Sequence, residues 1–312
     1  MKSFRGYSLL FLKGIAMGGA DVVPGVSGGT IAFITGIYEE LIDSIKSIDL
    51  AALKLLFAGK FKEFWTKING TFLLVLFSGI LLSLFSLAKL IIYLMENHPI
   101  SLWSFFFGLI LISAVLVFKK IHSLSIGVVV GGIAGIAIGF IITTIAPINT
   151  DNSLLITFLS GAIAITAMIL PGISGSFILL ILGKYEFILQ SVKNLKIDVI
   201  IVFGIGCAVG LLSFSRLIAW VLKKYHNVTV AVLAGFMLGS LNKIWPWKEV
   251  LEYRINSHGA QVPLVENSIL PNEYLLLTGN DPQFLQAILF MLLGIILVLG
   301  MERISYLIQP RS

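Results

Sequence analysis

The chain has 312 residues, of which 57% are hydrophobic and only 12% are charged, and its mean hydropathy is +1.00. A soluble globular protein carries about 25% charged residues, so this chain lacks the charge that would cover a soluble surface. Several apolar runs reach about 20 residues, the length that crosses a bilayer as a helix. The composition excludes a soluble enzyme, a nucleic-acid binder, a disordered tail and a disulfide scaffold, and it predicts a polytopic α-helical membrane protein.

A motif near the N-terminus occurs a second time in the middle of the chain. Residues 24–46 read PGVSGGTIAFITGIYEELIDSIK and residues 171–193 read PGISGSFILLILGKYEFILQSVK, with 11 of 23 positions identical without a gap. The identities include Pro, Gly, Ser, Tyr and Glu, which shared hydrophobicity does not explain. The match resumes downstream, where Ser86, Lys89 and Gly108 align with Ser213, Arg216 and Gly235. We therefore expect a tandem duplication of one membrane unit.

Each copy of the motif interrupts an apolar stretch that is too short to span a membrane. Residues 9–23 and 28–38 would cross roughly half to two-thirds of a ~30 Å hydrocarbon core as helices, and so would residues 154–170 and 174–185. The Pro-Gly-x-Ser-Gly sequence between them does not suit a continuous helix. Irregular backbone at that depth survives only where protein or water covers it. Each motif thus predicts a re-entrant helical hairpin with its tip near the midplane, facing a cavity.

The expected fold is all-α, with two inverted-topology repeats that each contain a hairpin followed by three transmembrane helices. An odd number of crossings separates the hairpins, so they enter from opposite faces, as in many transporters. The first repeat, residues 1–150, comprises a hairpin at about 8–47, an interfacial basic helix at 49–69 and spans near 70–95, 99–118 and 124–146; the second repeat, residues 151–312, comprises a hairpin at about 152–195, spans near 197–222, 228–243 and 283–307, and a polar external loop at 244–282.

The distribution of positive charge supports this layout. The net charge is +6, with 22 Lys and Arg against 16 Asp and Glu. With both termini cytoplasmic, 13 of these cations fall on the inner side and six on the outer side, which satisfies the positive-inside rule. The single cysteine, Cys207, excludes an intramolecular disulfide, and no Cys/His cluster indicates a metal site.

The two tips are candidate sites for an anion. Each places the start of a half-helix, with its unpaired N–H groups and positive dipole end, at the centre of the protein. Glycine allows close backbone approach, and serine adds a hydroxyl donor. The alternative is a tight turn where helices pack closely, but two matched copies favour the anion site. The candidate phosphate-binding residues of the tips are Pro24, Gly25, Ser27, Gly28, Gly29, Thr30, Pro171, Gly172, Ser174, Gly175 and Ser176.

Two charges near the first tip have no charged counterpart in the second repeat. Asp21 and Lys13 align with Met168 and Ser160. Because ionisable groups inside a membrane are costly, we hypothesise that Asp21 couples transport to an ion, by protonation or by ligating Na⁺. A structural Lys13–Asp21 pair, or a cap on the following half-helix, explains these residues equally well.

Four further charges occupy matched positions in the two repeats. Lys89 and Arg216 could collect a lipid phosphate from each leaflet, and the alternative is that they extend to the membrane interface. Glu39 and Glu186, each after a tyrosine, fall where the hairpins regain the interface. Capping or pairing is the simpler role for these glutamates, and a direct role stays open.

The segments GGADVVPGVSGGT at 18–30 and MILPGISGS at 168–176, with their G-x-Y-E continuations, resemble the polyprenyl-phosphate transporter family over nearly the whole chain. The resemblance implies a flippase in the cytoplasmic membrane that returns undecaprenyl phosphate from the outer to the inner leaflet for reuse in cell-envelope synthesis. We expect membrane lipids as neighbours and, from the hypothesis for Asp21, H⁺ or Na⁺ as the coupling ion. We expect no catalytic residues, cofactor, metal or nucleic acid. A homo-oligomer is compatible with this function.

Two other functions remain open at this point. An integral-membrane phosphatase acting on a prenyl pyrophosphate can also carry such motifs, but it should surround the leaving phosphate with arginine and place a base nearby. The chain has five arginines, and none lies in either tip motif. A transporter of small soluble anions differs from a flippase only in whether the cavity opens sideways to lipid.

Overall fold

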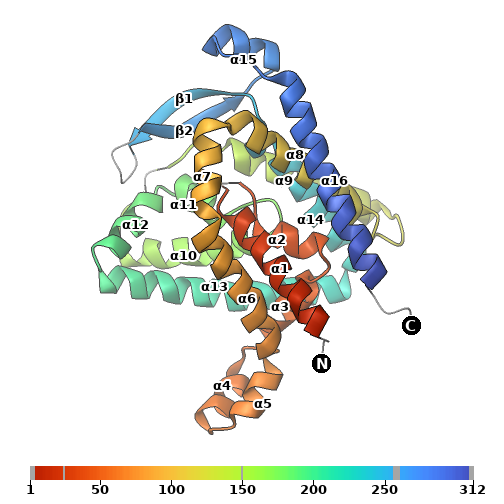
Figure 1. The fold of residues 1–312 in the computed structure, drawn as a ribbon. Helices are drawn as coiled ribbons and strands as arrows, with labels where there is room; N and C mark the ends of the chain where they lie inside the picture. The colour runs from red at the N-terminus through yellow and green to blue at the C-terminus, as the bar shows by residue number, and fades with distance from the viewer. Residues whose placement is uncertain (1–3, 24, 149, 256–260, 309–312) are drawn as a thin grey trace.

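The computed structural model describes residues 4–23, 25–148, 150–255 and 261–308, which form a mostly helical protein with one pair of strands (Figure 1). In this part of the chain, five helices are long and apolar enough to cross a membrane. The prediction of a polytopic α-helical membrane protein is therefore confirmed. The five are α8 (Pro99–Phe118), α9 (Ile126–Thr144), α13 (Ile197–Lys224), α14 (His226–Ser240) with its 3₁₀ extension η1 (Leu241–Ile244), and α16 (Phe284–Ile308).

Both duplicated motifs fold into the same series of three helices. In each series, a long helix ends at the motif, a seven-residue helix follows it, and a nine-residue helix begins at the tyrosine of Gly-x-Tyr. The glycine of Gly-x-Tyr has positive φ in both copies, 72° at Gly36 and 65° at Gly183, a conformation that favours glycine. The helices are α1 (Phe4–Asp21), α2 (Gly28–Ile34) and α3 (Tyr38–Lys46) in the first series, and α10 (Leu154–Ile169), α11 (Gly175–Ile181) and α12 (Tyr185–Lys193) in the second.

The segment predicted as one interfacial helix at 49–69 is instead two short helices, α4 (Leu50–Phe57) and α5 (Phe61–Lys67). Gly59 has a φ of 70° and breaks the helix between them. The pair projects from one end of the molecule (Figure 1), with Phe57 86% exposed. The following span, predicted at 70–95, is also divided, into α6 (Gly70–Ser86) and α7 (Ala88–Asn97).

The segment predicted as an external loop at 244–282 contains regular structure within this mostly helical protein. It forms an antiparallel hairpin of β1 (Lys248–Ile255) and β2 (Gln261–Ser268), followed by α15 (Pro271–Thr278). Trp247 is buried against Ile100 and Ile269 and anchors the start of the hairpin. The hairpin and α15 lie at the opposite end of the molecule from α4 and α5 (Figure 1).

The two halves of the chain pack together through equivalent pairs of helices. Helix α1 packs along α6 and α10 packs along α13, whereas α8 packs along α16 and α14 packs along α9. A Cβ at Gly108 of α8 would lie 2.0 Å from the carbonyl oxygen of Met291, and a Cβ at Gly235 of α14 would lie 2.2 Å from that of Gly132. Residues aligned by the duplication therefore make equivalent close contacts.

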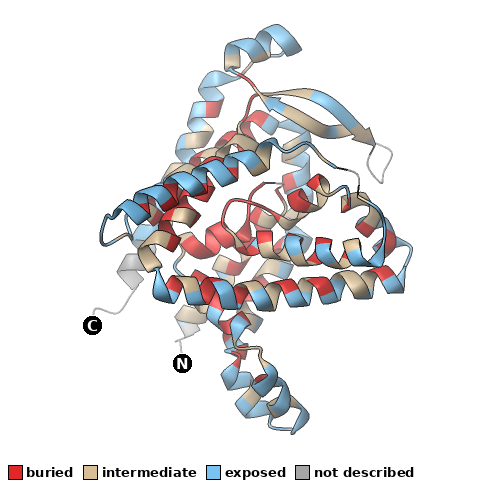
Figure 2. Cartoon of the chain, turned by 180° about the vertical axis from the view of Figure 1, so that it is seen from behind, coloured by how far each residue is buried: buried red, intermediate tan, exposed pale blue. Residues whose placement is uncertain are grey.

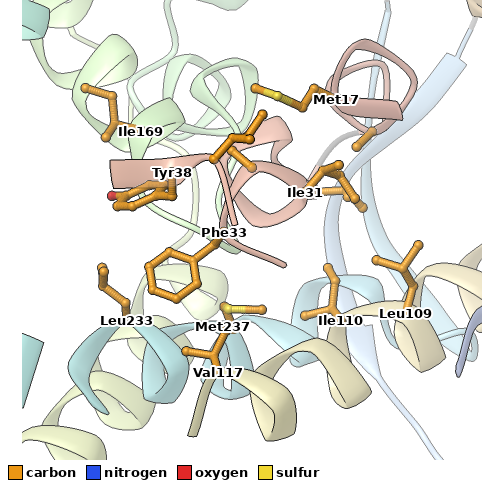
Figure 3. Close-up of a cluster of buried hydrophobic side chains, with 14 of the residues drawn as sticks. Met17, Ile31, Phe33, Tyr38, Leu109, Ile110, Val117, Ile169, Leu233 and Met237 are labelled. Carbon is orange, nitrogen blue, oxygen red and sulfur yellow. The ribbon is translucent and has the colours of Figure 1, made fainter. Parts of the chain in front are cut away.

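The most deeply buried residues surround the first hairpin. Viewed from behind, the buried residues gather at the centre of the molecule (Figure 2). Side chains of α2, α8 and α14 meet there, as the close-up of Phe33, Ile110 and Met237 shows (Figure 3). Ile110 and Met237 are fully buried. This packing holds the tip of the first hairpin inside the protein.

Candidate functional site where the two tips meet

The first tip connects α1 to α2 and is held by two side-chain caps. The N–H of Gly28 donates to Asp21 Oδ1 at 2.7 Å, and the N–H of Gly29 donates to Ser27 Oγ at 3.0 Å. Gly25 has a φ of 90°, which an L side chain rarely adopts. Among the predicted tip residues, Pro24 lies outside the described residues. The Asp21 carboxylate thus acts as a cap on the half-helix.

The second tip, between α10 and α11, repeats this geometry. Gly172, the counterpart of Gly25, has a φ of 100°. Ser174 Oγ accepts from the N–H of Phe177 at 3.2 Å and lies 3.1 Å from Ser176 Oγ. Pro171 is buried, and Gly175 is partly buried. The duplicated glycines and serines therefore have the same local role, namely a left-handed turn followed by an N-cap.

The two tips are hydrogen-bonded to each other, although 142 and 149 residues separate the bonded pairs in sequence. The N–H of Gly25 donates to Ser174 Oγ at 3.2 Å, and the N–H of Gly172 donates to Thr30 Oγ1 at 2.9 Å. Ser27 Oγ also donates to the carbonyl oxygen of Met168 at 3.0 Å. The tips consequently form one polar cluster inside an apolar protein.

The backbone donors at the start of α2, in the first tip, already have acceptors. Gly28, Gly29 and Thr30 donate to Asp21, the side chain of Ser27 and the carbonyl oxygen of Ser27, respectively. An anion can use the same N–H groups only where it replaces one of these acceptors. Positive side chains close to the tips are therefore the ligands that an anion could reach first.

The other charged residues that the sequence singled out, Lys13, Glu39 and Glu186, have partners outside the tips. Lys13 Nζ donates to the carbonyl oxygen of Thr35 at 2.6 Å, at the C-terminal end of α2, where a cation is favourable. Glu39 Oε1 lies 3.4 Å from His226 Nε2. In the second repeat, the Glu186 carboxylate pairs with Arg254 of β1.

The structure does not bring Lys89 or Arg216 to the tips. Both side chains are exposed, Lys89 in the first turn of α7 and Arg216 in the C-terminal half of α13. Neither forms a hydrogen bond or ion pair with another described residue. Their positions suit contact with lipid rather than with the polar cluster.

One lysine that the sequence motifs did not indicate, Lys243, contacts both tips. A Cβ at Gly25 would lie 2.7 Å from Cγ of Lys243, and Lys243 Nζ lies 5.0 Å from the centre of the Phe177 ring. Lys243 closes an apolar span just before two tryptophans. This pattern is typical of an interfacial lysine, so the sequence did not single it out.

An apolar cavity of about 520 Å³ adjoins the first hairpin. It lies between α1, α2, α7, α8 and α16 and is lined by Ala20 and Ile31, on either side of the first tip. Its volume is in the range of roughly 300–1,000 Å³ typical of ligand pockets. Its polar lining includes His98, Ser101 and Gln286, and Gln286 Nε2 donates to Ser101 Oγ at 2.8 Å.

The described residues offer no group of three or more His, Cys, Asp or Glu side chains that could hold a metal ion. The fold and the site together define a polytopic helical membrane protein with a buried polar cluster, at which two matched helix breaks meet beside an apolar cavity.

Comparison with known proteins identifies the family. A family model described as undecaprenyl phosphate translocase-like matches residues 17–262. A polyprenyl-phosphate transporter of Vibrio cholerae is 49% identical over 297 residues, which is 95% of this chain and 96% of the relative. One of Staphylococcus aureus is 35% identical over 265 residues, which is 79% of this chain and 88% of the relative. No solved structure matches. The chain belongs to the undecaprenyl phosphate translocase-like family.

Proposed function

We propose that this protein is a flippase for polyprenyl phosphate, and that the phosphate crosses the membrane at the point where the two tips meet. The observation that carries this proposal is the pair of reciprocal hydrogen bonds from Gly25 to Ser174 and from Gly172 to Thr30. Family membership and the names of both relatives support the substrate. When these bonds open, the hydroxyls and N–H groups of both tips become available to the phosphate.

The proposed architecture is a pair of inverted repeats in the cytoplasmic membrane. Its support is the exchange of equivalent helices, in which Gly108 and Gly235 make matching close contacts with the opposite half of the chain. The end that carries α4 and α5 would face the cytoplasm because lysines concentrate there. Helix α1 begins and α16 ends toward that same end (Figure 1).

Labelling of single cysteines tests this orientation. With Cys207 replaced by serine, we expect a cysteine at Lys62 of α5 to react with an impermeant thiol reagent only from the cytoplasmic side. A cysteine at the exposed Glu252 of β1 should react only from the outside. Both sites reacting from one side would contradict the topology.

The apolar cavity favours a lipid substrate over a small soluble anion. Its lining is dominated by aliphatic and aromatic side chains from α1, α8 and α16, which suit the part of an isoprenoid chain next to the phosphate. The remainder of the chain would stay in the bilayer. The direction of flux, from the outer to the inner leaflet, and coupling to H⁺ or Na⁺ through Asp21 are parts of the same proposal.

A phosphatase remains the less favoured function. Arg254 is paired with Glu186, and Arg216 is exposed. Neither arginine is available to stabilise a leaving phosphate at the polar cluster, as such an enzyme would require. We therefore assign no catalytic residues.

Reconstitution into liposomes tests the proposed function. Polyprenyl phosphate is incorporated, and a membrane-impermeant protein that binds the head group reports how much of it faces outward. We expect the purified protein to change this exposed fraction, under a pH or Na⁺ gradient if transport is coupled. No change that depends on the protein under any gradient would refute the proposal, and release of phosphate from a prenyl pyrophosphate would favour the enzyme instead.

A further inference from the structure

A buried cluster of three charges lies beside the tips and takes no part in the contacts between them. Lys243 of η1 and Lys248 of β1 both pair with Glu266 of β2, with Nζ to Oε2 distances of 2.9 and 3.3 Å. Lys248 Nζ also donates to the carbonyl oxygen of Lys243. The side chains of Lys243, Lys248 and Glu266 are only 18%, 9% and 20% exposed, respectively. Two cations thus share one carboxylate, and the cluster has a net positive charge.

The cluster is built against both tips. The stem of Lys243 contacts Gly25 of the first tip, and its ammonium group lies 5.0 Å from the centre of the Phe177 ring, in the first turn of the helix after the second tip. The ammonium group of Lys248 lies 5.2 Å from the centre of the Trp103 ring on α8. An anion that reaches the contact between the tips would therefore meet these lysines.

The two buried lysines carry more positive charge than the single carboxylate of Glu266 can neutralise. Burial and the neighbouring Lys243 lower the pKa of Lys248 to about 8. Burial also raises the pKa of Glu266, but the two lysines more than offset this effect and leave it below its usual value. A buried cation is costly without a partner, so a second anion would stabilise the pair of lysines.

Glu266 lies on β2, in the two-stranded β1–β2 hairpin. A two-stranded hairpin has little stability of its own, and the register of β1 is irregular between Val250 and Tyr253. The ion pair of Arg254 with Glu186 joins the β1–β2 hairpin to α12, and Glu266 joins it to Lys243 of η1. Release of Glu266 would remove one contact between β2 and η1, where Ser268 Oγ also donates to the carbonyl oxygen of Asn242.

We infer that Lys243 and Lys248 are the cationic ligands of a phosphomonoester. Glu266 is then an internal carboxylate that occupies the phosphate position until the substrate binds. The inference rests on the proposed function and names residues that neither the motifs nor the family resemblance indicated. A phosphate would replace the Glu266 carboxylate on the two ammonium groups. The displaced carboxylate would move away together with β2. The β1–β2 hairpin would therefore change position when phosphate binds.

Binding in detergent tests the exchange separately from transport. Farnesyl phosphate serves as a short prenyl phosphate, inorganic phosphate as the free anion, and farnesol as the uncharged lipid. We expect Glu266→Gln to bind farnesyl phosphate at least about fivefold more tightly than the unaltered protein, because no internal carboxylate competes. Lys243→Met should bind it at least about tenfold more weakly. Binding of farnesyl phosphate but not inorganic phosphate identifies a lipid head-group site, and equal effects on both identify a general phosphomonoester or phosphate site.

Matched variants exclude a general effect of charge or folding. Glu252→Gln on β1 and Lys196→Met change the same charges at exposed positions and should bind like the unaltered protein. Because Lys243→Met leaves Glu266 with one partner, the double variant Lys243→Met/Glu266→Gln removes both charges, and it should fold and still bind weakly.

The outcomes distinguish this inference from the proposed function. Unchanged or weaker binding by Glu266→Gln, or unchanged binding by the double variant, would overturn the inference even where liposomes show transport. Conversely, the expected pattern of affinities without any movement of lipid would support the phosphate site and refute the flippase. Farnesol binding as tightly as farnesyl phosphate would also overturn the inference, because the lysines would then contribute nothing.

Discussion

Replacing Ser174 with alanine tests whether the contact between the tips stabilises the protein. The hydroxyl of Ser174 caps α11 through the N–H of Phe177 and also accepts from the N–H of Gly25 in the other repeat. Loss of a cap costs about 0.5–2 kcal/mol. Leaving a buried N–H without an acceptor costs about 1–3 kcal/mol more. We therefore expect Ser174→Ala to reduce the free energy of unfolding by about 1.5–5 kcal/mol.

Ser153 provides the matched control because it caps α10 and has no bond to the other tip. Its Oγ accepts from the N–H of Ile156 at 3.4 Å, and its side chain is exposed. Ser153→Ala should therefore cost only about 1 kcal/mol. The difference between the two variants reports the bonds that Ser174 makes beyond its cap, namely those to Gly25 and Ser176.

Thermal unfolding in detergent, followed by tryptophan fluorescence at one scan rate, measures this difference. A change of 1 kcal/mol shifts the midpoint by about 2–4 °C in chains somewhat shorter than this one, so Ser174→Ala should unfold roughly 2–6 °C below Ser153→Ala. Equal midpoints for the two variants would refute the claim that the tips stabilise each other.

Three further predictions follow from close contacts and charges. Gly108→Ala should prevent stable folding or lower the unfolding midpoint by many degrees, since its Cβ would lie 2.0 Å from a backbone carbonyl oxygen of α16. The control Gly204→Ala should be tolerated, because its Cβ would have no neighbour within 4 Å. Similar midpoints for the two variants would contradict the packing of α8 on α16. Lys248 is faced by Lys243, Glu266 and the Trp103 ring, and its pKa of about 8 lies below the usual 10.5, so its positive charge is present below pH 8 and is lost as the pH rises through 8. The affinity for farnesyl phosphate should fall across that range, and a flat profile from pH 7 to 9.5 would contradict a role for this ammonium group. Asp21→Asn keeps an acceptor for the N–H of Gly28, so it should fold but lose the dependence of transport on the H⁺ or Na⁺ gradient; an unchanged dependence would exclude Asp21 as the coupling residue.

The duplicated motif shows how far the sequence could predict the structure. Proline and glycine cannot continue a helix without cost, so the breaks after α1 and α10 were predictable from local chemistry. The repeated glycines have positive φ at the tips and at both Gly-x-Tyr turns. The five apolar helices were also predictable, because their length and hydropathy are local properties.

Other features depended on contacts between distant segments. The bond between Gly172 and Thr30 joins residues 142 positions apart, and no local pattern specifies which acceptor a tip amide finds. The hairpin of β1 and β2 was missed because its strands are mixed in polarity and are anchored by Trp247 against α8. The division of α4 from α5 follows from the single Gly59, which the periodicity of the apolar residues obscured.

The charged residues illustrate the same limit. The sequence showed that Lys89 and Arg216 occupy equivalent positions, but both side chains are exposed. Lys243 resembled an ordinary interfacial lysine, and only its contacts with Gly25 and Phe177 place it at the polar cluster. Equivalence in sequence identified the fold better than it identified the ligands.

Photolabelling locates the phosphate most directly. The protein is reconstituted in liposomes with a polyprenyl phosphate that carries a photoreactive group on the isoprene unit next to the phosphate, and the labelled peptides are identified by mass spectrometry. We expect labelling of the tips, near residues 25–31 and 171–177, and of the segment around Lys243, with each label lost when excess unmodified polyprenyl phosphate competes. Competed labelling confined to the exposed faces of α7 and α13, with none at the tips, would contradict the claim that the head group passes where the two tips meet.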